Sequence, residues 1–138
     1  MRRAENKNVK TEKIAEAKRH LANAKETICK SPLGKTGKLF LDEKCVREGA
    51  GIGYLAALKA IDGYLLQKGV PEKELPQSIE AYRKAIKKRI PLNGELMENL
   101  QVAYENLHLG AYYRGIKTVA MVKDGLSAVK KIIELLEK

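Results

Sequence analysis

The sequence has few of the residues that bind metals or form disulfides. Its 138 residues include two cysteines and two histidines. Cys29 and Cys45 lack the spacing of a metal site, and a soluble domain of this length does not need a disulfide, so we expect two reduced thiols. His20 and His108 lie far apart in the sequence, and no cluster of carboxylates accompanies them. We therefore expect no transition-metal site and no cofactor.

The sequence also lacks a long hydrophobic run. Its most apolar window, residues 49–66, contains Lys59 and Asp62 and is too short and too polar to cross about 30 Å of hydrocarbon. The first ten residues, MRRAENKNVK, are basic but lack the apolar core of a signal peptide. These absences predict a cytoplasmic protein that does not enter a membrane.

Alternation of apolar and polar residues, the signature of a half-buried strand, is missing as well. No motif repeats at a fixed period. A chain of this length forms one domain, and its apolar residues recur at helical spacing. The sequence therefore predicts an all-α fold without a sheet.

The formal net charge of +10 is the strongest compositional bias. A basic protein invites a nucleic-acid interpretation. Here the basic residues are spread over every segment and alternate with glutamates, which is typical of solvated helix faces. The charge alone favours nucleic-acid binding only modestly.

The rest of the chain is organised around the stretch from Asp42 to Lys68, which contains no proline. Asp42 is a plausible N-cap, and Gly69 is well placed to end the helix. Each glycine inside a helix costs roughly 1 kcal/mol relative to alanine, so tertiary packing must offset the cost. We predict a buried central helix whose small residues allow a neighbouring helix, a ligand or a second copy of the chain to come close; its glycines are Gly49, Gly51, Gly53 and Gly63.

Four further helices are predicted from apolar stripes and from cap and proline signals. We expect Leu39, Phe40 and Leu41 to return to the core from the connection after the first helix. In chain order, the predicted segments are a helix over residues 11–30, a connection over 31–41, a helix over 75–90, a helix from Asn93 with a break at 113–116, and a helix over 119–136. Short connections favour an up-and-down bundle of four to five helices in a single domain, residues 1–138, with a flexible basic arm at residues 1–8.

Two motifs give the sequence a family resemblance. The first has the form AxxHLxxAKE and comprises Ala17, His20, Leu21, Ala24, Lys25 and Glu26. The second, GYLAALKAIDGYLLQKG, contains the segment Ala57-Leu58-Lys59-Ala60. Together they resemble the HEPN-like superfamily, helical domains often encoded beside minimal nucleotidyltransferases, and in particular its small members from Bacteroides relatives.

The resemblance implies two branches with different functions. Ribonuclease members carry an arginine, a polar residue and a histidine four to six residues after the arginine. Here no histidine follows Arg83, Arg89 or Arg114 at that distance, and His108 precedes Arg114. The catalytic motif is absent, so no catalytic residue is carried over and we expect no enzyme. Non-catalytic members are binding bundles, often dimeric. We therefore expect a binding module for a protein partner or a small ligand that forms a homodimer, with a nucleotidyltransferase as a possible partner.

Polar and aromatic residues gather on the fourth predicted helix. Tyr104, His108 and Tyr112 follow one another at four-residue steps and therefore share one face. With Tyr113 and Arg114 they could line a small ligand pocket, provided that the glycines of the central helix lie opposite. The alternative is that the tyrosines are core rings with wetted hydroxyl groups and His108 is a boundary residue.

A basic face on the third predicted helix supports the alternative function, nucleic-acid binding. Its positive side chains recur on one side and could follow a phosphate backbone, and Arg2 and Arg3 could add a mobile arm. Aromatic side chains for stacking on bases are missing from this face, because Tyr82 belongs to the apolar stripe. The face could equally be a solvated surface; it comprises Arg83, Lys84, Lys87, Lys88 and Arg89.

Overall fold

The computed structural model describes the backbone of residues 2–138 and the side chains of residues 8–138. Within these residues the fold is all-α, as predicted, and no strand is present beyond two isolated bridges. The elements, in chain order, are α1 (Arg2–Cys29), α2 (Glu43–Gln67), the 3₁₀ turn η1 (Glu72–Glu74), α3 (Ile79–Arg89), α4 (Gly94–Ala103), the π-helix η2 (Tyr104–Tyr113) and α5 (Val119–Glu137).

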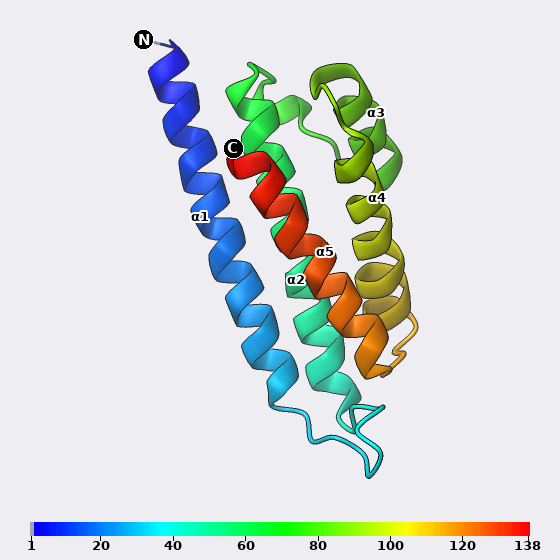
Figure 1. The fold of residues 1–138 in the computed structure, drawn as a ribbon. Helices are drawn as coiled ribbons and strands as arrows, with labels where there is room; N and C mark the ends of the chain where they lie inside the picture. The colour runs from blue at the N-terminus through cyan, green and yellow to red at the C-terminus, as the bar shows by residue number, and fades with distance from the viewer. Residues whose placement is uncertain (1) are drawn as a thin grey trace.

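The long helices form an up-and-down bundle. α4 and η2 follow each other without a break, so the bundle has four long rods, α1, α2, α4 with η2, and α5 (Figure 1). The shorter α3 lies beside the upper half of α4 (Figure 1). None of the helices described is both long and apolar enough to cross a membrane.

The prediction of a central helix is confirmed. α2 contacts α1, α5 and η2, and eleven of its residues are buried. Its first turn is capped by Asp42, whose carboxylate accepts a hydrogen bond from the Cys45 amide at 3.3 Å. At its other end Gly69 adopts a φ of 96°, a left-handed conformation that stops the helix.

Glycines of α2 allow the neighbouring helices to come close. A Cβ atom on Gly49 would lie 2.3 Å from Cγ1 of Ile28, and one on Gly63 would lie 2.7 Å from Cβ of Lys13. Both of these neighbours belong to α1, whereas a Cβ atom on Gly53 would lie 3.0 Å from Cδ2 of Leu126 on α5. These three glycines therefore serve packing within one copy of the chain and do not lie at a seam between two copies.

Two predicted helix starts were wrong. α1 begins at Arg2, so residues 2–8, which the sequence analysis assigns to an arm, are helical. The third helix begins at Ile79 and not near Leu75, because Ser78 caps it by accepting a hydrogen bond from the Ala81 amide at 3.1 Å. A separate 3₁₀ turn precedes this cap.

The connection over residues 31–41 is tied to the segment just before α5. The Phe40 amide donates to the Lys117 carbonyl, and the Val119 amide donates to the Lys38 carbonyl, both at 2.9 Å. Of the three apolar residues expected to return to the core, only Phe40 is buried, while Leu39 and Leu41 are exposed. A backbone held in an extended, bridged form turns alternate side chains to opposite sides, which explains this difference.

Candidate functional site

An aromatic column runs along η2. The ring centroids of Tyr104 and His108 lie 5.5 Å apart, and those of His108 and Tyr112 lie 6.0 Å apart with an interplanar angle of 17°. The structure thus brings together three of the five residues that the sequence analysis placed in a ligand site. The other two lie outside the column, because Tyr113 and Arg114 are exposed at the end of η2.

The backbone of this segment is a π-helix, whereas its spacing predicted an ordinary α-helix. Its wider turns are closed by bonds such as the Arg114 amide to the Leu109 carbonyl, at 3.0 Å. Contacts with α5 accompany this form: Asn106 donates from Nδ2 to the Met121 carbonyl at 3.0 Å, and a Cβ on Gly110 would lie 3.0 Å from Sδ of Met121. π-Helical turns are rare and frequently occur at functional sites.

The central helix completes the column with a fourth ring. Tyr54 lies 4.9 Å from His108 and 6.1 Å from Tyr104 between ring centroids. Gly51 makes room for the last ring, since a Cβ there would lie 3.2 Å from Cδ2 of Tyr112. The condition that a glycine of the central helix lies opposite the predicted site therefore holds for Gly51.

A shallow groove of about 410 Å³ opens beside the column. Its lining is almost entirely apolar or aromatic, and Glu48 is the one charged side chain that the described residues contribute to it. Most of this lining was not predicted from the sequence, because Tyr54 and Leu55 belong to a segment interpreted as a uniformly buried helix. The lining residues are Glu48, Gly51, Ile52, Tyr54, Leu55, Leu58, His108 and Tyr112.

The electrostatic environment of the column suits its side chains to contact with another surface better than to proton transfer. Burial raises the pKa of Tyr54 to about 12, so its phenol stays neutral at physiological pH. Among the described residues, His108 has ring contacts on its faces and no carboxylate within hydrogen-bonding distance. A general base needs a partner that orients its imidazole. The arrangement can stack against another apolar or aromatic surface.

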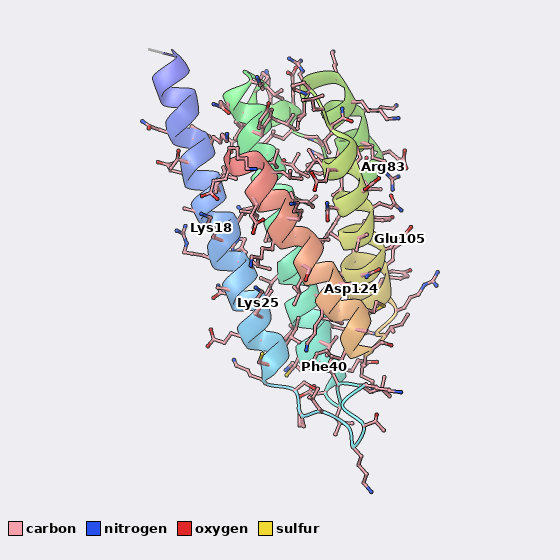
Figure 2. All side chains as sticks on the ribbon, viewed as in Figure 1. Lys18, Lys25, Phe40, Arg83, Glu105 and Asp124 are labelled. Carbon is pink, nitrogen blue, oxygen red and sulfur yellow. The ribbon has the colours of Figure 1, made fainter. Side chains whose placement is uncertain are left out.

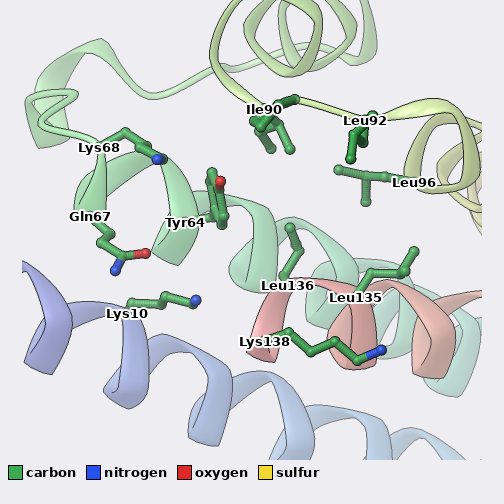
Figure 3. Close-up of a pocket in the computed structure, with 11 residues that line it drawn as sticks. Lys10, Tyr64, Gln67, Lys68, Ile90, Leu92, Leu96, Leu135, Leu136 and Lys138 are labelled. Atoms are coloured by element: carbon green, nitrogen blue, oxygen red, sulfur yellow. The ribbon is translucent and has the colours of Figure 1, made fainter.

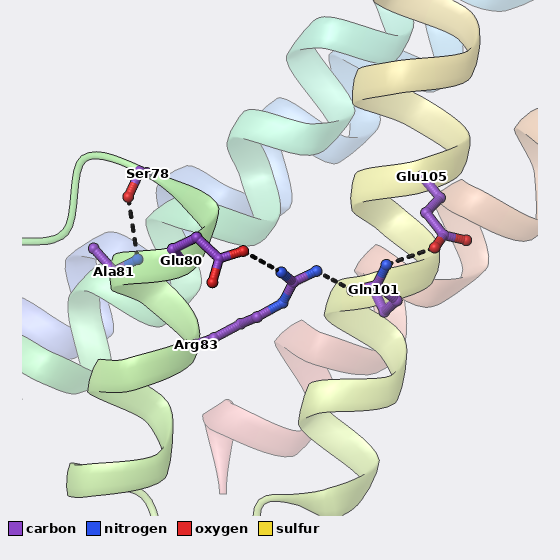
Figure 4. A network of polar contacts seen from close by, with 6 residues as sticks. All are labelled: Ser78, Glu80, Ala81, Arg83, Gln101 and Glu105. Atoms are coloured by element: carbon purple, nitrogen blue, oxygen red, sulfur yellow. Dashed lines mark hydrogen bonds and ion pairs between the residues drawn. The ribbon is translucent and has the colours of Figure 1, made fainter.

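Arg83 belongs to the end of this column and not to an open basic face. Its guanidinium forms an ion pair with Glu80 at 2.8 Å and donates to Gln101 on α4 (Figure 4). It also lies 5.8 Å from the ring centroid of Tyr104. Gln101 in turn donates to Glu105 at 2.5 Å. The guanidinium is therefore held against the bundle.

The remaining residues of the predicted nucleic-acid face stay exposed on α3. These four are Lys84, Lys87, Lys88 and Arg89. The side chains of Arg2 and Arg3, the proposed arm, lie outside the described residues. Without Arg83 the basic face is smaller than the sequence predicted.

Residues 12–138 match a family described as a domain of unknown function, DUF5618. The chain belongs to the DUF5618 family. Among solved structures, a protein of unknown function from Dyadobacter fermentans is similar to it, with 26% identity and a TM-score of 0.77 over 92% of this chain and 95% of that chain. No curated protein matches.

The DUF5618 match includes every residue of the column and the groove. Neither description names a ligand, a partner or a reaction. Within the residues described, no group of three histidine, cysteine, aspartate or glutamate side chains could hold a metal ion, and both thiols are free.

A second opening lies at the upper end of the DUF5618 bundle. It measures about 350 Å³ and has Tyr64 on one side, with Nζ of Lys10 and of Lys68 each 5.4 Å from the ring centroid (Figure 3). Leu92, which is fully exposed with a φ of 51°, forms part of its rim. The lysines here are already engaged with the tyrosine ring.

One partly buried polar pair was not singled out by the sequence. The Tyr82 hydroxyl of α3 donates to Asp62 of α2 at 2.9 Å. Burial raises the pKa of Asp62, although the Tyr82 hydrogen bond and the charges of Lys13 and Lys59 act in the opposite direction. Burial also raises the pKa of Tyr82. The pair fastens the short α3 to the central helix.

We expect Asp62→Asn to stabilise the protein at pH 7 by about 1 kcal/mol, the usual scale of one buried polar contact. The folded state holds the Asp62 proton more tightly than the unfolded chain does, so the stabilisation from Asp62 is complete below about pH 4 and is lost as the pH rises through the raised pKa. The amide keeps an acceptor for Tyr82 but carries no charge. Urea unfolding of both proteins from pH 4 to pH 8 should show the advantage of the variant growing with pH. An advantage that is constant with pH would rule out this cause.

Proposed function

We propose that this DUF5618 protein is a HEPN-like binding module without catalytic machinery of its own, and that it pairs with a second copy of itself through the groove beside the aromatic column. The observation that carries the proposal is an exposed apolar surface on rigid elements. Leu55 is 44% exposed and Tyr112 is 48% exposed, and both line the groove. Exposed apolar patches of this kind mark interaction sites.

The composition of the groove supports a second copy as its occupant. In a two-fold dimer the same patch meets itself, so a patch rich in like charges would repel its copy. Of the side chains that the structure describes, this lining has a single charged one, Glu48. Ile52 and Leu58 are half-buried beside the exposed Leu55, so a copy that covers them removes apolar surface from water.

The aromatic column supports the proposal that His108 acts through contact with the second copy and not through proton transfer. Rings of Tyr54, Tyr104 and Tyr112 surround the imidazole, which fixes its position before any partner arrives. Preorganised aromatic side chains lose little conformational entropy on binding and are enriched where interfaces gain most of their affinity.

We expect Leu55→Glu to weaken dimer formation at least ten-fold, because it buries a charge without a partner in the interface. Sedimentation equilibrium over a wide concentration range measures the dissociation constant. Val102→Glu is the matched control, since Val102 is 37% exposed on α4 and does not line the groove. A wild-type protein that is monomeric at every concentration, or a dimer equally weakened by both variants, would disprove this interface.

A further inference from the structure

A larger groove lies on another side of the bundle, between α1 and α5. The C-terminal end of α5 meets the middle of α1, where Lys18 forms an ion pair with Glu137. Figure 1 shows that the orange N-terminal end of α5 is set apart from α1. The connection over residues 31–41 closes the lower end of the opening, beside Phe40 (Figure 2). The resulting groove measures about 560 Å³, within the range of small-molecule sites.

The floor of this groove is apolar and preformed. It consists of core side chains with small exposed fractions: Ile28, Phe40, Val119, Val122 and Leu126. Phe40 is held by its backbone bond to Lys117, so the floor does not depend on a mobile loop. Leu33, 53% exposed, forms an apolar lip at the closed end. A preformed apolar floor reduces the ordering cost of binding.

The rim of the groove is basic. Lys25 comes from α1, and Lys123 and Lys130 come from α5, and all three are exposed. Among the described residues none of the three forms an ion pair, in contrast to Lys18 and Lys131, which do. No carboxylate from residues 8–138 lines the groove. The acidic neighbours Glu26 and Asp124 lie next to lysines in sequence but outside the lining.

We propose that this groove binds a single-chain anionic amphiphile, a fatty-acid-like molecule whose aliphatic chain lies on the floor and whose carboxylate lies among the three lysines. The α5 lining runs from Val119 to Lys130, a length of about 16 Å at 1.5 Å per residue, which suits an extended alkyl chain. A free inorganic anion would leave the apolar floor uncovered. A partner helix, about 10 Å in diameter, is too thick for a groove of this volume that is closed at one end. The site shares no lining residue with the column, so it does not depend on the proposed dimer.

Sodium decanoate and dodecanoate, kept below their micelle concentrations, are suitable probes in calorimetric titrations. Each buried methylene group should tighten binding about four-fold, so dodecanoate should bind about 16-fold tighter than decanoate. Dodecanol has the same chain without the charge and should bind at least ten-fold more weakly than dodecanoate. Equal affinity of the acid and the alcohol would overturn the role of the lysines, and an affinity independent of chain length would overturn the role of the floor.

Two variants locate the ligand in this groove. The triple change Lys25→Glu, Lys123→Glu and Lys130→Glu should weaken dodecanoate binding at least 30-fold, because it replaces attraction by repulsion at exposed positions that the fold does not need. The control, Lys84→Glu with Lys87→Glu and Lys88→Glu on α3, alters net charge equally and should leave binding unchanged.

Ser127→Trp fills the groove from an exposed position without changing charge, and should abolish binding of both acids. Circular dichroism checks that each variant is folded. Absence of binding by the wild type, or retention of binding by both the triple and the tryptophan variant, would overturn the proposal.

Discussion

Replacing Gly49 by valine should lower the free energy of unfolding by about 3 kcal/mol, the upper end of the usual cost of overpacking a core. A Cβ at this position would lie 2.3 Å from Cγ1 of Ile28 and 2.9 Å from the carbonyl oxygen of Ala24. The Ile28 side chain is buried and the carbonyl belongs to the backbone of α1, so neither can move without displacing that helix. Valine recovers less helix propensity than alanine would, because it ranks between alanine and glycine.

Gly94→Ala provides the control for this prediction. Gly94 is the first residue of α4, and no atom lies within 4 Å of a Cβ built there. Alanine should therefore stabilise the protein by up to about 1 kcal/mol, through helix propensity and a less flexible unfolded chain. Urea denaturation of the two variants and the wild type measures both effects. If Gly49→Val stays within 1 kcal/mol of the wild type, the close approach of α1 and α2 is not maintained by this glycine.

Features set by neighbouring residues were predicted well. The apolar stripe of the first helix is buried at every predicted position: Ile14, Ala17, Leu21, Ala24 and Ile28. The bounds of α2 follow from Asp42, whose side chain caps the first turn, and from Gly69, which adopts a positive φ. In each case the physical cause lies within a few residues of its effect, so the sequence displays it.

Features set by distant partners were not predicted. Arg83 was assigned to a solvated face, but it donates to Gln101, 18 residues further along the chain. Tyr54 was read as part of an apolar run, and its role depends on rings that a different helix supplies. The π-helical form of residues 104–113 accompanies contacts with Met121 on α5, and nothing in its own spacing distinguishes it from an α-helix.

Tyr54→Ala should destabilise the protein by about 3 kcal/mol, the lower end of the cost of deleting a large buried aromatic side chain. The ring is buried against both Tyr104 and His108, so its removal leaves a cavity at the middle of the column. Tyr112 contacts His108 and lies over Gly51, and it should lose part of its support. Urea denaturation measures the loss of stability, and sedimentation equilibrium measures the accompanying change in self-association.

Tyr54→Phe separates the ring from its hydroxyl group. Among the described residues the hydroxyl of Tyr54 has no hydrogen-bond partner, so its removal should change stability by less than about 0.5 kcal/mol. Phenylalanine keeps the stack, and therefore the groove and the dimer should be retained. A phenylalanine variant that loses as much stability as the alanine variant would show that the hydroxyl holds the column together. A folded alanine variant that dimerises like the wild type would separate the column from the interface, because the exposed ring of Tyr112 would then not need its buried neighbours to bind a second copy.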